Sequence, residues 1–225
     1  MKLLSLALLF CAAATSLSFS GEERLLAKVT KDLSSAREAA ERGEFAKAEA
    51  LVLLVRNPQI KVEVNGETSP RELQALEEAT AIWEQAMGGA IDFEIVPQGQ
   101  GQVRVQFQQD VHFAGVASMG RATWVRQLLD FGWGSYGAHV TATIQVRTHL
   151  DGRECRLDQI RHAVAHELGH VLGLEDSPRM GDIMGPQVDG PSPVLPSDDE
   201  VMALSELHWE AFQVELMAKS TAPRH

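Results

Sequence analysis

Apolar side chains return every three or four residues in four parts of the chain, which predicts amphipathic helices. The first part, residues 22–55, is rich in Ala, Leu, Glu and Lys. Gly43 interrupts this part and predicts a helical hairpin that turns at the glycine. Further helices are expected over residues 68–87, 157–172 and 197–217. In the helix over 157–172 the apolar residues share one face, so its histidines are expected to lie away from the core.

Other parts of the chain alternate apolar and polar residues, which is typical of strands that are buried on one face. Four such segments span residues 59–64, 91–96, 103–107 and 141–147. Residues 121–140 place Trp124, Trp133 and Tyr136 among glycines. We expect a loop or short helix there, which lines a cleft or covers an edge of the core. The mixture of helices and strands predicts an α+β domain.

The first 20 residues have the composition of a secretory signal peptide: one basic residue, an apolar run and then small residues. We expect cleavage after Ser20 and a secreted or periplasmic protein. The apolar run is too short to span a bilayer, so no stable membrane insertion is expected. Residues 21–57 then form the helical hairpin, and Asn57-Pro58 marks a boundary. The main domain is expected over 58–217, followed by a flexible tail over 218–225.

Charge and cysteine content narrow the function further. Removal of the signal peptide leaves 19 basic and 31 acidic side chains, a formal charge of −12. This acidic excess argues against a nucleic-acid partner, which requires a basic surface. Cys155 is the one cysteine that remains, so no intramolecular disulfide can form despite the export signal.

The candidate chemistry lies in the helix predicted over 157–172. His166, Glu167 and His170 have the spacing H-E-x-x-H, which places both imidazoles on one face of a helix, where they can bind one ion. Neutral imidazoles suit Zn²⁺, and Glu167 lies close enough to take a proton from an attacking water. Gly173 ends the helix because glycine readily adopts the left-handed conformation. The turn after it carries Asp176 back as a candidate third ligand.

Residues 166–176 resemble the zinc signature of the metzincin metallopeptidases, H-E-x-x-H-x-x-G-x-x-H/D, and are most similar to its matrixin-like branch. Metzincins also carry a methionine turn downstream, and Met184 matches it within Asp-Ile-Met-Gly-Pro. Most matrixins have a histidine as third ligand, whereas Asp176 resembles the snapalysin type. Glu175 is a neighbouring carboxylate that breaks the family spacing.

The resemblance implies a metzincin-like mixed β-sheet with an active-site helix and a C-terminal helix, preceded here by the helical hairpin. It implies a secreted zinc-dependent endopeptidase with one catalytic zinc, Glu167 as general base and a protein or peptide as substrate. Residues 113–120 match the edge strand that pairs with extended substrate in the family. Gly115, Val116 and Ala117 are therefore expected to bind substrate.

Several alternatives stay open from the sequence. The chain could be a zinc-stabilised, non-catalytic binding protein whose helical hairpin recruits a partner. The hairpin resembles the middle of a tetratricopeptide repeat, but only one such unit is visible. It could be a partner-binding segment or a pro-segment, or a helical extension that packs on the main domain. His162 is expected to be a solvated polar residue, and His208 a structural one. No ligand pattern supports a calcium ion or a second metal site.

Overall fold

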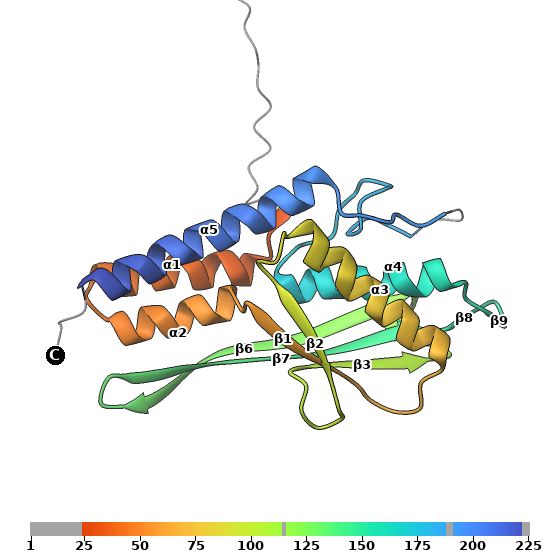
Figure 1. Ribbon diagram of the computed structural model, residues 1–225, viewed down its shortest axis with the longest axis horizontal. Coiled ribbons are helices and arrows are strands. Elements are labelled where there is room, and N and C mark those ends of the chain that lie inside the picture. The colour runs from red at the N-terminus through yellow and green to blue at the C-terminus, as the bar shows by residue number, and fades with distance from the viewer. Residues whose placement is uncertain (1–23, 114–115, 188–190, 222–225) are drawn as a thin grey trace, which may run out of the picture.

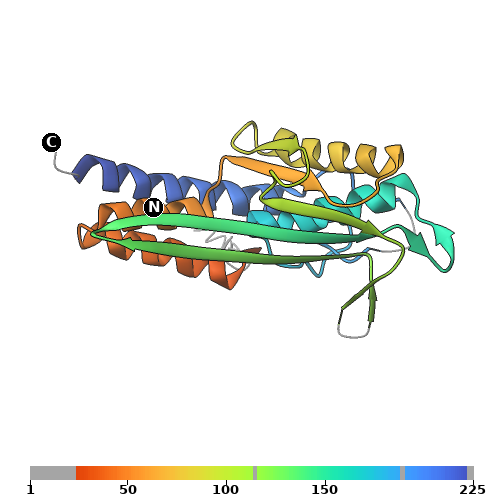
Figure 2. The same cartoon turned by 90° about the horizontal axis from the view of Figure 1, so that it is seen from below.

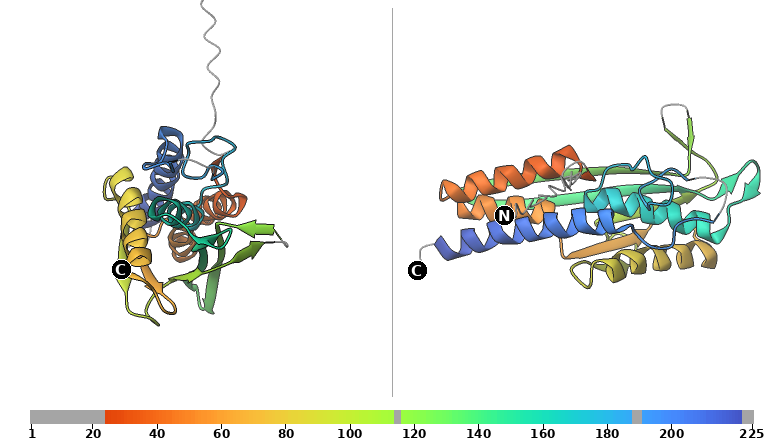
Figure 3. Two further views of the ribbon diagram at one scale, coloured as in Figure 1. Left: turned by 90° about the vertical axis from the view of Figure 1, so that its right-hand side faces the viewer. Right: turned by 90° about the horizontal axis from the view of Figure 1, so that it is seen from above.

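The computed structural model describes residues 24–113, 116–187 and 191–221, which form two layers. Five helices cover one face of a five-stranded sheet (Figure 1; Figure 3, left). The strand order is β2-β1-β3-β7-β6, and all neighbours are parallel except β6 and β7. The strands are β1 (Gln59–Val64), β2 (Asp92–Val96), β3 (Val103–Gln108), β6 (Gly120–Gly132) and β7 (Ser135–Arg147). The predicted α+β fold with a mixed sheet is confirmed.

The helices begin and end close to the residues that the apolar spacing indicated. They are α1 (Ala27–Glu41), α2 (Phe45–Val55), α3 (Pro70–Ala86), α4 (Leu157–Leu172) and α5 (Asp198–Thr221). Gly43 has φ of 78° in the turn between α1 and α2, a conformation that glycine adopts without strain. Ser69 and Glu72 form a capping box at the start of α3. The predicted helical hairpin is therefore present.

The prediction of a loop or short helix over residues 121–140 is wrong. These residues belong to a long antiparallel ribbon, in which β6 and β7 pair from Gly120↔Val146 to Gly132↔Ser135 (Figure 2). The glycines that indicated a loop lie mainly at the tip of the ribbon, where Gly132 and Gly134 have positive φ. Apolar and polar side chains do not alternate regularly in this segment. It still forms strands, because pairing between β6 and β7 provides hydrogen-bond partners for backbone N–H and C=O groups along the ribbon.

The ribbon also changes which strand forms the edge of the sheet. Residues 113–120 were expected to do so, but β6 is the edge strand of the five-stranded sheet. β5 (Val116–Ser118) instead pairs with β4 (Val111–Phe113) in a separate two-stranded sheet that projects beside it (Figure 2). The last two strands, β8 (His149–Leu150) and β9 (Arg153–Glu154), form another small hairpin before α4.

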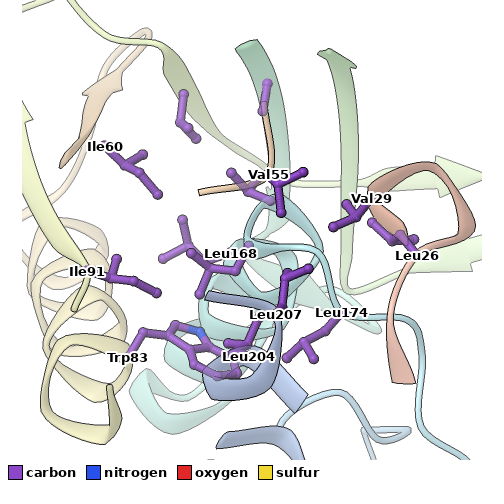
Figure 4. Packing of buried hydrophobic residues seen from close by; sticks show 14 of the residues in the cluster. Leu26, Val29, Val55, Ile60, Trp83, Ile91, Leu168, Leu174, Leu204 and Leu207 are labelled. Carbon is purple, nitrogen blue, oxygen red and sulfur yellow. The ribbon is translucent and has the colours of Figure 1, made fainter. Parts of the chain in front are cut away.

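The helical hairpin shares one hydrophobic core with the rest of the molecule. α2 packs against α5 and the β6–β7 ribbon, and α1 packs against α5 (Figure 3, right). Leu26, Val29 and Val55 belong to the same cluster of buried side chains as Trp83 and Leu168 (Figure 4). The hairpin is thus built into the fold.

One buried cation connects the hairpin to the helix of the predicted metal site. Arg126, on β6, donates hydrogen bonds of 2.5 Å to the carbonyl oxygens of Leu54 and Val171. Both carbonyls lie in the last turn of a helix, α2 and α4 respectively, where no intrahelical donor is available. Burial lowers the pKa of Arg126 to about 10, so it stays a cation near neutral pH. This contact holds the C-terminal ends of the two helices together.

Among the described residues, no helix combines the length and apolarity that a membrane span needs.

His208 on α5 is buried, as a structural residue should be, and it is expected to make the protein sensitive to acid. Burial, with help from the Arg56 cation, lowers the pKa of His208 to about 4. The unfolded chain takes up this proton near pH 6.5, so stability falls as pH drops from about 6.5 to 4. We expect His208 to account for about 2–3 kcal/mol of the unfolding free energy lost between pH 7 and 4.5.

Urea unfolding at both pH values measures this effect. A His208→Leu variant should lose less stability in acid than the parent. The exposed His139→Leu variant should behave like the parent. Equal acid sensitivity in all three proteins would contradict the assignment.

Candidate active site

Helix α4 and the turn that follows it bring three potential metal ligands together. Gly173, with φ of 117°, ends the helix in the left-handed conformation and reverses the chain. Asp176 Oδ1 consequently lies 3.1 Å from His166 Nε2 and 3.4 Å from His170 Nε2. Ligand atoms from these three side chains all lie within 4.8 Å of one another. Glu175 belongs to no such cluster in the described part of the chain.

The backbone around the two histidines fixes which ring nitrogen is free. His166 Nδ1 lies 3.0 Å from the carbonyl oxygen of Ile183, and His170 Nδ1 lies 2.8 Å from that of Leu174. A carbonyl can only accept, so each Nδ1 carries the hydrogen and each Nε2 keeps its lone pair when the ring is neutral. Both Nε2 atoms face Asp176. Such supporting bonds are typical of histidines that bind metal.

The donor set fits zinc. Two imidazole nitrogens and one carboxylate oxygen are a known set for catalytic Zn²⁺, which leaves a fourth position for water or substrate. When the His166 and His170 rings are protonated, their Nε2–H groups can donate to Asp176, and this interaction holds the pKa of the Asp176 carboxyl group well below its usual range, so it stays an anion. The Asp176 side chain is 76% exposed, whereas the two histidine side chains are 20% and 13% exposed. The cluster therefore opens to solvent on the side of the carboxylate.

Glu167 lies beside these ligands on α4 and is buried, with 5% exposure. Burial raises the pKa of its carboxyl group, although the neighbouring His166 and His170 and a hydrogen bond from the Ala122 backbone oppose this rise. Gly120 at the start of β6 leaves the space that the carboxylate occupies. A Cβ atom at Gly120 would lie 2.4 Å from Glu167 Oε1 and 2.8 Å from its Cγ.

A Gly120→Ala substitution should therefore displace the Glu167 carboxylate. We expect peptide hydrolysis to fall about 100-fold, since a misplacement of about 1 Å in a catalytic group can have that effect. Zinc content should stay the same, because the ligands lie elsewhere. Ser135→Ala, at an exposed position of β7 at the tip of the same ribbon, is the control. Parent-like turnover in Gly120→Ala would show that the carboxylate tolerates the shift.

Met184 lies in the turn where the sequence placed it. Its side chain is buried against Gly169, where a Cβ atom would lie 2.2 Å from Met184 Sδ. The fully buried Glu200 of α5 holds the turn by accepting from the Met184 backbone N–H at 2.7 Å and from that of Ile183 at 3.3 Å. Ile183 is the residue whose carbonyl orients His166, so α5 supports the ligand through this turn.

Two cavities flank Glu167 and His166. One, of about 300 Å³, is bounded by Met119, His162 and the segment 185–187 after the methionine turn. The other, of about 350 Å³, extends from the three ligands along residues 120–124 of β6 and includes Leu26. Trp124 stacks on His170 in this second cavity, with 6.0 Å between ring centroids. Together the cavities form a cleft that runs past the ligand cluster.

One expectation about this region is wrong and another stays a prediction. His162 is not a solvated residue: it is 3% exposed, and its Nε2 lies 3.0 Å from the Ile183 carbonyl oxygen, which can only accept. Of the three expected substrate-binding residues, Gly115 lies outside the described residues, and Val116 and Ala117 lie in β5, apart from the main sheet. Their role in binding stays a prediction.

Some residues of the site were missed from the sequence. Gly120 lies against the Glu167 carboxylate, Trp124 stacks on His170, and Glu200 binds the methionine turn. Glu200 could be recognised only as an acidic residue in the first turn of a helix. The two β6 residues could have been found only by pairing β6 with β7.

The fold and the ligand cluster together resemble those of a metzincin-like metallopeptidase. The family model described as Matrixin matches residues 59–209, and the protein therefore belongs to the matrixin family. Members of this family normally bind zinc and act on proteins or peptides. A comparison with curated proteins found no match.

Proposed function

We propose that the protein is a secreted zinc-dependent endopeptidase in which His166, His170 and Asp176 hold the catalytic metal. The observation that carries the proposal is the convergence of these three side chains, with the Glu167 carboxylate beside them, in an open cleft. The Asp third ligand is of the snapalysin type. The signal peptide expected over residues 1–20 lies outside the described residues and supports secretion by its sequence alone.

Zinc bound at this site would supply Lewis acidity, which polarises a carbonyl group and lowers the pKa of water. Glu167 then acts as the general base that removes a proton from the attacking water and delivers it to the leaving amine. Burial of Glu167 supports this role, because it raises the pKa of the carboxyl group and so makes the carboxylate a stronger proton acceptor. The backbone bond from Ala122 and the gap at Gly120 keep the carboxylate in place.

The first part of β6 is suited to bind an extended peptide. It is the edge strand of the sheet, and residues 120–124 line the larger cavity beside the ligands. An exposed edge can add a peptide as another strand through main-chain hydrogen bonds. We propose that β6 takes the substrate-pairing role that the sequence placed on residues 113–120.

Cleavage of a quenched-peptide library by the purified, zinc-loaded protein tests this function. We expect hydrolysis that a chelator abolishes and added zinc restores. A protein that binds zinc but cleaves neither the library nor denatured casein would instead be the zinc-stabilised binding protein that the sequence left open.

A further inference from the structure

Residues 24–26, directly before α1, pair with the loop that carries the third candidate ligand. Leu25 forms an antiparallel bridge with Leu174. The Leu26 N–H donates to the Gly173 carbonyl oxygen at 2.8 Å, and the Glu175 N–H donates to that of Arg24 at 2.8 Å. A short two-stranded ladder thus holds residues 173–175, directly before Asp176.

This ladder includes the peptide group of Leu174, which orients the candidate ligand His170. The Leu174 carbonyl oxygen accepts the hydrogen bond from His170 Nδ1, at 2.8 Å. Leu174 is fully buried, and Leu25 and Leu26 are 9% and 7% exposed. Val29, in the first turn of α1, has a side-chain carbon 3.2 Å from the Cβ position of Gly173. Hydrogen bonds and packing from residues 24–29 therefore hold the turn between His170 and Asp176 in place.

Arg24 extends the same support to the methionine turn. Its Nη1 lies 2.9 Å from Asp182 Oδ2, and its Nη2 lies 3.6 Å from Asp199 Oδ2. The side chains of Arg24 and Asp182 are only 11% and 8% exposed, so this ion pair is shielded from solvent. Asp182 also accepts from Ser177 Oγ at 2.6 Å. Both loops that shape the metal centre are thus tied to one arginine.

We propose that Arg24 and Leu26 are positioning residues of the metal centre, and that the helical hairpin is its permanent support. Both residues act through the loops over residues 173–176 and 182–184. Removing the hairpin would take the ladder and the ion pair with it. The hairpin therefore differs from a pro-segment, whose release activates an enzyme. This inference rests on the proposed function only in taking the three-residue cluster as a metal site.

Two matched pairs of variants in the full chain test the proposal. Leu26 has φ of −55°, which proline also adopts, so Leu26→Pro removes the N–H donor without straining φ. Leu26→Ala also truncates the side chain but keeps the donor. Arg24→Gln removes the shielded ion pair. Arg37→Gln is its control and removes an exposed ion pair between Arg37 of α1 and Glu210 of α5.

Two measurements are made on each variant: the zinc dissociation constant, by competition with a chelator, and the visible spectrum of the Co²⁺-substituted protein, which reports ligand geometry. We expect Leu26→Pro and Arg24→Gln to bind zinc at least about 10-fold more weakly than their controls, because support of a ligand has effects of that size. Their Co²⁺ spectra should also change. A purely structural role would lower thermal stability and leave the spectrum as it is.

Each outcome decides the proposal. Zinc affinities and Co²⁺ spectra equal to those of the controls would overturn it while leaving the peptidase function intact. A parent protein that takes up neither Zn²⁺ nor Co²⁺ would overturn both the inference and the proposed function. If Leu26→Pro does not fold, the comparison of Arg24→Gln with Arg37→Gln decides alone.

Discussion

Replacing Glu167 by glutamine is expected to lower kcat/KM for peptide hydrolysis by about 10³-fold and to leave zinc bound. General acid–base groups contribute about 10²–10⁴-fold to enzymatic rates, and glutamine cannot take the proton. The substitution keeps the shape of the side chain, so its packing against Gly120 and the acceptor for the Ala122 N–H survive. The loss should thus be one of chemistry and not of folding.

Turnover of a quenched peptide and metal content measured on the same sample check this prediction. Glu206→Gln, on the exposed side of α5, is the matched control and should behave like the parent. Full activity in Glu167→Gln would remove this carboxylate from the mechanism. Loss of zinc together with activity would instead assign it a role in holding the metal.

Replacing Asp176 by alanine is expected to weaken zinc binding by more than about 100-fold and to abolish hydrolysis. Residues that only support a ligand already contribute 10–100-fold to metal affinity, so the loss of a ligand should exceed that range. The two imidazoles would remain, but the third corner of the site would be open to water. Chelator competition gives the affinity directly.

The same experiment decides between the two adjacent carboxylates. Glu175→Ala should keep zinc affinity, because Glu175 is not part of the ligand cluster in the described residues. The exposed Asp92→Ala is a further control for the change in net charge. If Glu175→Ala loses zinc while Asp176→Ala keeps it, the third ligand is Glu175 and the loop after Gly173 must adopt another conformation.

Helix α4 shows what a local pattern can establish. Its bounds, its left-handed end at Gly173 and the convergence of His166, His170 and Asp176 all follow from spacing within about twenty residues. Such features depend on backbone geometry that neighbouring residues determine. They were accessible without knowledge of the tertiary structure.

The β6–β7 ribbon shows where local pattern fails. Its pairing depends on contacts between strands and on packing against α2 and α4, and its buried Arg126 contradicts the usual alternation of apolar and polar residues. His162 was misjudged for a similar reason. Its burial comes from the methionine turn, whose carbonyl at Ile183 supplies a partner from 21 residues further along the chain.

Arg24 was missed because nothing in its own neighbourhood indicates a role. It lies just after the expected signal peptide, and its partner Asp182 is 158 residues away in sequence. Contacts of this range connect elements that a sequence pattern treats as separate. They are also the contacts that the proposed metal centre depends on.

The common core of the hairpin and the sheet has a practical consequence for recombinant production. A gene trimmed to residues 59–209, the range that the family model matches, would encode a protein without α1 and α2. The apolar faces of β7 and of the shortened α5, against which α2 packs in the full chain, would then be exposed to water. Large apolar patches of this kind cause aggregation in water. Soluble expression should therefore require a start codon placed no later than Arg24, and an affinity tag is better attached to the opposite terminus.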